Sequence, residues 1–278
     1  TTLQVSSLNT AQIVALTNDQ ITRLKSDQIA SLTTLQVASL ESADLAAIQA
    51  SQLKGLKSSQ LAAITTSQLA AVTGSQLQTL ESSQFSGLTT LQIKTLSIDQ
   101  IKSFTATQMA GFSTAQLVAI TTEQLQAIAA DVISKLTTAQ VASLTTAQVV
   151  ALTAEQTSRL TSDQLGALTS SQILVLETVD LQAISTQQIT GLKSSQLSVL
   201  TLDQIDTLSI DQLTALSTAQ MQGLTSVQIK ELSAEQFTNL NTKQLSSLSS
   251  AQWAAVDATD MAELSLSKLG ALSSKTMS

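Results

Sequence analysis

The sequence predicts an all-α solenoid, a superhelix in which each eight-residue repeat forms one very short helix. Three observations support this prediction. An apolar residue stands at every eighth position from Leu8 to Leu272, so the chain divides into 34 octads without insertion or deletion, followed by the tail 273–278. Most octads carry the same helix-start motif at the same place. Neither one continuous helix nor a β-strand accommodates an eight-residue period.

We number each octad from 1 to 8, with position 8 at the multiples of eight. The consensus is Thr/Ser, Thr/Ser, any residue, Gln, Ile/Leu/Val, any residue, a small residue and Leu, as in TTAQVASL-TTAQVVAL at 137–152. Position 5 is apolar in 33 of the 34 octads, and Thr157 is the exception. Position 4 is Gln in 29 octads, and the departures are Asp44, Val132, Asp180, Asp260 and Lys268.

The period excludes continuous secondary structure. Eight residues at about 100° each leave a drift of about 80° per octad, so an apolar stripe would circle a long helix within about five octads. In a half-buried strand the apolar residues alternate, whereas here they are spaced three and five apart. Each octad is therefore expected to hold its own helix.

The helix start is a capping box. Ser or Thr at position 1 and Gln at position 4 form the S/T-x-x-Q motif, in which each side chain accepts a hydrogen bond from an unpaired backbone N–H group. The preceding position 8 and position 5 then form a hydrophobic staple, as Leu16, Thr17, Gln20 and Ile21 illustrate. Where position 1 is Lys or Glu, position 2 is Ser or Thr, which predicts that each octad needs one hydroxyl at its entry; Gln49-Ala50 and Ala129-Ala130 lack one.

Helices of about six residues are too short to be stable alone, so neighbouring octads must bury the apolar residues at positions 5 and 8. Small residues at position 7 allow either a close approach of neighbouring helices or a kink at the helix end; they include Gly55, Gly87, Gly111, Gly191 and Gly223. The sequence leaves the number of octads per turn open. With helix rows about 8–10 Å apart, two per turn would give a rod of roughly 150 Å and three roughly 100 Å.

Two segments depart from the pattern. Residues 129–136, AADVISKL, lose the hydroxyl and the Gln but keep Ile133 and Leu136, which indicates a tolerated lapse or, alternatively, a local bend. From Trp253 onward the repeat degenerates, so we assign 1–256 to the regular solenoid and 257–278 to degenerate terminal repeats of the same solenoid. Trp253 is expected to fill the core, as are the other aromatic residues at positions 5 and 8: Phe85, Phe104, Phe112 and Phe237.

Composition narrows the possible functions. A net charge of −7 with only 13 scattered Lys and Arg argues against binding nucleic acid or an anionic membrane surface. No apolar run approaches the ~18 residues that a membrane span needs. The chain starts at Thr1 inside an octad, which is typical of a mature product or a piece of a longer array.

The chemistry of catalysis is missing from the sequence. His, Cys and Tyr are absent, and nothing near the many Ser and Thr residues could activate a nucleophile. Acids one octad apart, such as Asp19 and Asp27 or Asp203 and Asp211, are explained by helix starts rather than by metal binding. We therefore expect no enzymatic activity and assign no catalytic, cofactor-binding or metal-binding residue.

The octad LTTAQVxxL resembles the octapeptide-repeat arrays of very large bacterial secreted or surface adhesin-like proteins, some of which carry a haem-utilisation label. The resemblance covers nearly the whole chain and implies an exported, fibrous or stalk-like role at the cell surface or outside the cell. A haem role finds no support, because the remaining candidate axial ligands are methionines: Met109, Met221, Met261 and Met277.

Three functions stay open at this point. The first is a structural repeat protein that forms a rigid extracellular filament, stalk or matrix or adhesin fibre and associates end to end or laterally with itself. The second is a surface-binding module whose Thr/Ser ladder recognises ice or a glycan. The third is a helical scaffold that binds protein partners. Cell-surface or matrix components are further expected partners of the first.

Overall fold

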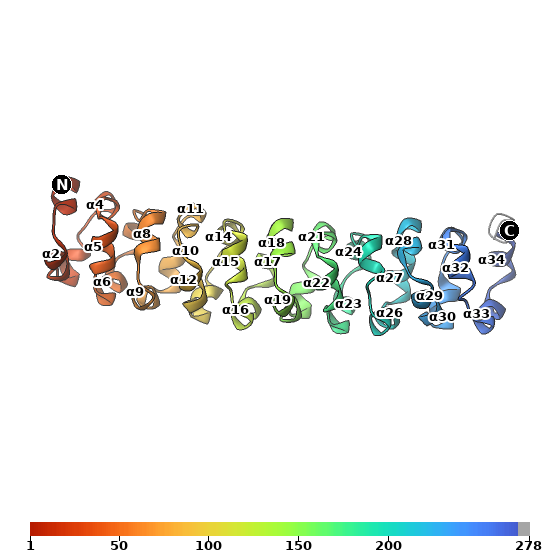
Figure 1. Cartoon of the computed structure of the whole chain (residues 1–278). Coiled ribbons are helices and arrows are strands. Elements are labelled where there is room, and N and C mark those ends of the chain that lie inside the picture. Colours follow the sequence, from red (N-terminus) through yellow and green to blue (C-terminus); the bar gives the residue numbers. More distant parts are fainter. Residues whose placement is uncertain (272–278) are drawn as a thin grey trace. The chain divides into compact units, whose positions relative to one another are not determined.

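The computed structural model describes residues 1–271, which contain 34 α-helices of four to six residues and no β-strand. The predicted fold class, a solenoid with one short helix per octad, is confirmed. The chain divides into two compact units, residues 1–144 and 145–278, and in each unit the helices follow one another in successive turns (Figure 1). The proposed boundary at residue 256 lies within the second unit and stays a prediction, and residues 272–278 lie outside the described residues.

The first unit contains helices α1 to α18: α1 (Thr2–Ser6), α2 (Thr10–Val14), α3 (Asn18–Ile21), α4 (Ser26–Ser31), α5 (Thr34–Ser39), α6 (Ser42–Ala47), α7 (Ala50–Leu53), α8 (Ser58–Ala63), α9 (Thr66–Ala71), α10 (Gly74–Gln78), α11 (Ser82–Phe85), α12 (Thr90–Thr95), α13 (Ile98–Lys102), α14 (Ala106–Ala110), α15 (Thr114–Val118), α16 (Thr122–Ala127), α17 (Ala130–Ile133) and α18 (Thr138–Ser143).

The second unit contains helices α19 to α34: α19 (Thr146–Val150), α20 (Ala154–Ser158), α21 (Ser162–Ala167), α22 (Ser170–Leu174), α23 (Thr178–Ala183), α24 (Thr186–Ile189), α25 (Ser194–Leu197), α26 (Leu202–Thr207), α27 (Ile210–Ala215), α28 (Thr218–Gly223), α29 (Ser226–Glu231), α30 (Ala234–Asn239), α31 (Thr242–Ser247), α32 (Ser250–Trp253), α33 (Ala258–Glu263) and α34 (Leu266–Ala271).

Two extended residues separate one helix from the next. Leu96, at position 8, has φ −60° and ψ 139°, and Ser97, at position 1, has φ −70° and ψ 160°. Helix α13 then begins at position 2. No residue in the described part of the chain has a positive φ, glycines included. The chain therefore changes direction at positions 8 and 1, without the left-handed glycine that ends many helices.

Each turn of the superhelix takes between three and four octads. Helix α13 packs against α10 and α16, three octads away on either side. Hydrogen bonds, however, link Gln100 at the start of α13 to the backbone of Leu69 and Val72, 31 and 28 residues earlier. The two-octad turn considered from the sequence is therefore excluded.

The core is formed by positions 5 and 8, as predicted. Phe85, Phe104 and Phe112 cluster in the first unit with ring centroids 4.9–5.9 Å apart, and all three are buried. In the second unit Phe237 is buried and meets Trp253 edge to face at 6.1 Å. Trp253 itself is only half-buried, so it covers one side of the core instead of being enclosed by it.

The irregular octad 129–136 still folds as a helix. Helix α17 packs against α14, and Ile133 and Leu136 are buried although no side chain caps Ala129. The two apolar positions thus place the octad within the first unit, and the alternative of a local bend stays a prediction.

Glycine at position 7 serves close approach between neighbouring helices. A Cβ atom added at Gly87 would lie 2.6 Å from the Cα atom of Ser58 and would overlap the Ser58 carbonyl. The alternative, a kink at the helix end, is wrong because these glycines keep negative φ. The same contact with a serine at position 2, three octads earlier, recurs at the other four glycines, paired with Ser26 (Gly55), Ser82 (Gly111), Ser162 (Gly191) and Ser194 (Gly223).

We predict that Gly87→Ala destabilises the first unit by about 1–3 kcal/mol, because backbone atoms of two helices must move apart. Gly270→Ala is the matched control, since a Cβ atom there meets nothing within 4 Å. The control should be neutral or slightly stabilising. Urea denaturation followed by circular dichroism measures both changes, and equal stabilities for the two variants would contradict the close-approach explanation.

Candidate functional site: buried glutamines that join successive turns

The predicted capping box is present at most helix starts. In α15 the backbone N–H of Gln116 donates to the Ser113 hydroxyl at 3.2 Å, and the backbone N–H of Ser113 donates to Oε1 of Gln116 at 2.8 Å. Each side chain thus occupies one of the backbone donors that a helix start leaves unpaired.

The same glutamine makes a second connection that the sequence analysis missed. Nε2 of Gln116 donates to the carbonyl oxygens of Phe85 at 2.9 Å and Leu88 at 2.7 Å, which lie at the end of α11 one turn earlier. Helix ends leave carbonyl groups unpaired just as helix starts leave N–H groups unpaired. One side-chain amide therefore serves the start of one helix and the end of another.

We call this arrangement the inter-turn glutamine. Its Nε2 atom donates to carbonyl groups 28, 30 or 31 residues earlier, and in nearly every case the side chain is buried. In the first unit it is formed by Gln36, Gln52, Gln60, Gln68, Gln76, Gln84, Gln92, Gln100, Gln108, Gln116, Gln124 and Gln140. In the second unit it is formed by Gln188, Gln196, Gln204, Gln212, Gln220, Gln228, Gln236, Gln244 and Gln252.

The chemistry of this site requires an amide. A capping box accepts Glu as readily as Gln, because only an acceptor oxygen is needed. Glutamate would place a second oxygen, and a charge, against the carbonyl groups of the earlier turn. Glu occurs at position 4 in none of the 34 octads. That absence is the sequence signal that could have revealed the second role.

In the first four octads the glutamine at position 4 accepts a hydrogen bond at its own helix start but donates to no carbonyl group of an earlier turn. Gln12 accepts the N–H of Asn9 at 2.9 Å through Oε1, but its Nε2 atom has no carbonyl partner among residues 1–271, and the side chain is exposed. Gln4 and Gln20 are in the same situation, as is Gln28, which is half-buried. Each of these octads stands where no earlier turn of this chain covers it.

Three of the residues that replace Gln at position 4 differ in which hydrogen bonds of the inter-turn glutamine they keep: the local one at the helix start or the long-range one to the earlier turn. Asp44 keeps the local half, because the N–H of Glu41 donates to its Oδ2 atom at 2.9 Å. Lys268 keeps the long-range half, because its ammonium group donates to the carbonyl of Thr238, 30 residues earlier. Val132 preserves neither half.

Two of the acidic residues at position 4, Asp180 and Asp260, have raised pKa values. Burial, together with the neighbouring charge of Glu177, raises the pKa of Asp180 to about 6. Burial also raises the pKa of Asp260, with Asp257 and Glu263 acting in the same direction. In contrast, a hydrogen bond from its own backbone N–H and one from Thr121 lower the pKa of Glu123, an exposed acid at position 3.

The expected need for one hydroxyl per octad is not met at Gln49-Ala50 and Ala129-Ala130, where helices α7 and α17 still form. Where position 1 is Lys57 or Lys193, the side chain at position 1 makes no capping hydrogen bond, and the helix still begins at position 2. In these octads the glutamine still accepts the N–H of position 1, for example from Lys57 to Gln60 at 2.6 Å. The glutamine half of the box is therefore the constant one, and the hydroxyl half is dispensable.

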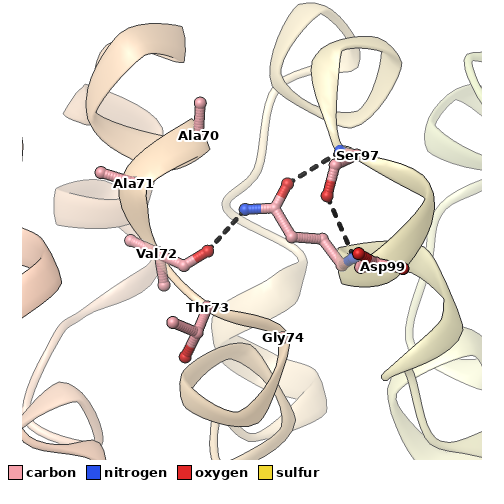
Figure 2. A pocket seen from close by; sticks show the side chains of 8 residues that line it. Ala70, Ala71, Val72, Thr73, Gly74, Ser97 and Asp99 are labelled. Atoms are coloured by element: carbon pink, nitrogen blue, oxygen red, sulfur yellow. Dashed lines mark hydrogen bonds between the residues drawn. The ribbon is translucent and has the colours of Figure 1, made fainter.

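A surface hollow of about 290 Å³ lies beside one inter-turn glutamine in the first unit. This glutamine is Gln100. Its Oε1 atom accepts the N–H of Ser97 at 2.8 Å, and its Nε2 atom donates to the carbonyl of Val72 at 2.7 Å (Figure 2). The rest of the lining is Ala70, Ala71, Thr73, Gly74 and Asp99. Its polar groups are hydroxyl, amide and a single carboxylate, with no base positioned to activate a nucleophile.

Within residues 1–271, no group of three or more His, Cys, Asp or Glu is placed to hold a metal ion. No helix in that range is long and apolar enough to cross a bilayer. Met109 and Met221 are buried in the core, Met261 is half-buried, and Met277 lies outside the described residues.

Comparison with known proteins identifies the repeat. The family model described as the ALTTAQ repeat matches residues 1–34, 37–74 and 173–210, which confirms that the chain is a repeat array of this type in those segments. No curated protein matches the chain.

Among solved structures, the leucine-rich repeat-containing protein LegL7 from Legionella pneumophila is similar at 18% sequence identity and a TM-score of 0.19. The match covers 84% of this chain and 77% of LegL7. A superposition this loose supports no conclusion about fold or function.

We predict that Gln116→Glu destabilises the first unit by about 2–4 kcal/mol, because a buried carboxylate would face the carbonyl groups of Phe85 and Leu88. Glutamate preserves the local half of the capping box, so the loss measures the inter-turn half alone. Gln12→Glu is the matched control and should change stability by less than about 0.5 kcal/mol. Urea denaturation tests the pair, and a Gln116→Glu protein as stable as the control would contradict the role assigned to Nε2.

We also predict that Val132→Gln stabilises the first unit by about 0.5–1.5 kcal/mol. The new amide would supply the inter-turn hydrogen bonds that octad 129–136 lacks, toward the carbonyl groups 28 and 31 residues earlier. Val14→Gln adds the same amide at an exposed position 6 and should have no such effect. Thermal unfolding of both variants measures the difference, and a loss of stability in Val132→Gln would show that the valine is needed for packing.

Proposed function

We propose that this protein is a structural repeat protein that forms a rigid extracellular filament, stalk or matrix fibre and associates end to end with itself. One observation carries the proposal. The helix ends of each turn are hydrogen-bonded to the adjacent turn by a contact that repeats at constant sequence separation within each unit. Such an arrangement can be extended by any further turn of the same kind.

The first turn supports self-association. The Nε2 atoms of Gln4, Gln12, Gln20 and Gln28 have no carbonyl partner among residues 1–271. The apolar residues at position 8 of the first three octads, Leu8, Leu16 and Leu24, are only half-buried. Their counterparts in later octads of the first unit, such as Leu56 and Leu80, are buried. A further turn, from the same array or from a second molecule, would satisfy both deficits.

The extracellular setting rests on the resemblance to secreted and surface arrays and on the absence of Cys, His and Tyr chemistry. We propose adhesion or matrix formation rather than catalysis for the same reasons. Ice or glycan recognition by a Thr/Ser ladder is less well supported, because hydroxyl groups such as those of Ser97 and Ser113 accept hydrogen bonds at their own helix starts.

Electron microscopy and analytical ultracentrifugation of purified residues 1–278 test the proposal. We predict concentration-dependent end-to-end assemblies that shorten in a Gln12→Glu/Gln20→Glu double variant, because carboxylates would repel the carbonyl groups of an added turn. The control is Gln78→Glu/Gln126→Glu, which makes the same charge change at exposed positions 6. A protein that stays monomeric at all concentrations would contradict self-association, and equal shortening in the control would show a general charge effect.

A further inference from the structure

Two departures from the repeat meet at one place in the second unit. Asp180 occupies position 4 of its octad and is 1% exposed, and Thr157 occupies position 5 of an earlier octad and is 0% exposed. Helices α20 and α23, which carry them, pack against each other. Neither Oδ2 of Asp180 nor Oγ1 of Thr157 has a hydrogen-bond partner. Unpaired buried polar atoms are costly and call for a physical explanation.

The register of the repeat gives the carbonyl groups that correspond to Asp180. At position 4 an inter-turn glutamine donates to carbonyl groups 28 and 31 residues earlier, as Gln212 does to Ile184 and Leu181. For Asp180 the corresponding carbonyl groups belong to Leu152 and Val149. An ionised carboxylate has no proton to donate to them, and the end of a helix carries a negative partial charge. A protonated carboxyl has one O–H donor, as an amide has its N–H.

The surroundings also disfavour the charged form. Burial is the main cause that raises the pKa of Asp180 to about 6, and the charge of Glu177 adds to it. The neighbouring Thr157 hydroxyl, which is not placed to form a full hydrogen bond, and the backbone N–H of Glu177 lower the pKa of Asp180, but more weakly. The charged residues on the packed helices α20 and α26 are Glu155, Arg159, Asp203 and Asp206, and none of them contributes to the shift.

We propose that Asp180 forms a pH-dependent contact between two turns of the second unit, made only when its carboxyl is protonated; we call this contact the joint. With its proton, the carboxyl donates to the earlier turn and closes the joint as a glutamine does. Without it, the carboxylate faces carbonyl oxygens, and the contact at the start of α23 loosens. The end of α23 stays joined to the next turn in both states, because Gln212 donates to Leu181 at 2.8 Å.

The direction of the pH effect follows from the raised pKa. The carboxyl of an unfolded chain titrates near 3.8, and that of the folded chain titrates at about 6. The stability that the protonated form contributes is therefore complete below pH 3.8 and is lost as the pH rises through about 6. The joint is closed at pH 5 and open at pH 7.5.

The test is thermal unfolding of the whole chain between pH 4.5 and 8, combined with NMR titration of the aspartate carboxyl carbons. In the unmodified protein we expect one carboxyl to titrate near pH 6 and the unfolding temperature to fall by several degrees as the pH rises from 5 to 7.5. Asp180→Gln restores the repeat consensus. It should abolish that fall and unfold at a higher temperature than the unmodified protein at pH 7.5.

Two further variants separate the joint from general effects. Asp203→Asn, an exposed acid on α26, should leave the fall in unfolding temperature intact. Thr157→Val removes the hydroxyl that favours ionisation and should move the titration to higher pH, a shift that a purely structural role would not produce. The proposal is overturned if Asp180 titrates near its ordinary pH, or if Asp180→Gln keeps the pH dependence. It is also overturned if added Na⁺ or Ca²⁺, not acid, raises the unfolding temperature of the unmodified protein.

Discussion

The whole structure depends on how a helix of about six residues disposes of its backbone polar groups. An α-helix leaves its first four N–H groups and its last four carbonyl groups without internal partners, so in so short a helix nearly every backbone group is at an end. The inter-turn glutamine provides hydrogen-bond partners for some of these end groups. Gln116 accepts an N–H at the start of its own helix and donates to two carbonyl groups at the end of a helix one turn earlier. Apolar burial at positions 5 and 8 brings the turns together, and the amide makes their contact specific.

The sequence predicted the local part of this arrangement and missed the long-range part. Helix starts and the core follow from residues within one octad, such as Thr17, Gln20 and Ile21, and these were placed correctly. The size of the turn and the role of Nε2 depend on partners 28–31 residues away, which an eight-residue period cannot reveal. The hydroxyl rule failed because it treated the two halves of the capping box as equals. In octad 49–56, which has no hydroxyl at position 1 or 2, Gln52 still accepts the backbone N–H of Gln49 and α7 forms.

The residues that depart from the repeat are explained by the long-range contact between turns, not by the helix start alone. Lys268 looks like degeneration in the sequence, yet it donates to the carbonyl of Thr238 in place of an amide. Asp44 keeps the local bond and gives up the inter-turn one. Asp180 and Thr157 are separate anomalies in the sequence and one buried polar pair in the fold. A scaffold made of near-identical turns thus acquires local differences through single residues at position 4.

Hydrogen exchange of the glutamine side-chain amides tests the central claim most directly. In NMR spectra recorded after transfer to heavy water, the account predicts that the Nε2 protons of inter-turn glutamines such as Gln116 and Gln228 persist with the backbone amides of their helices. Those of Gln4 and Gln12, which have no carbonyl partner, should disappear at once. Loss of all position-4 side-chain amides at the same fast rate, while the backbone stays protected, would contradict the account.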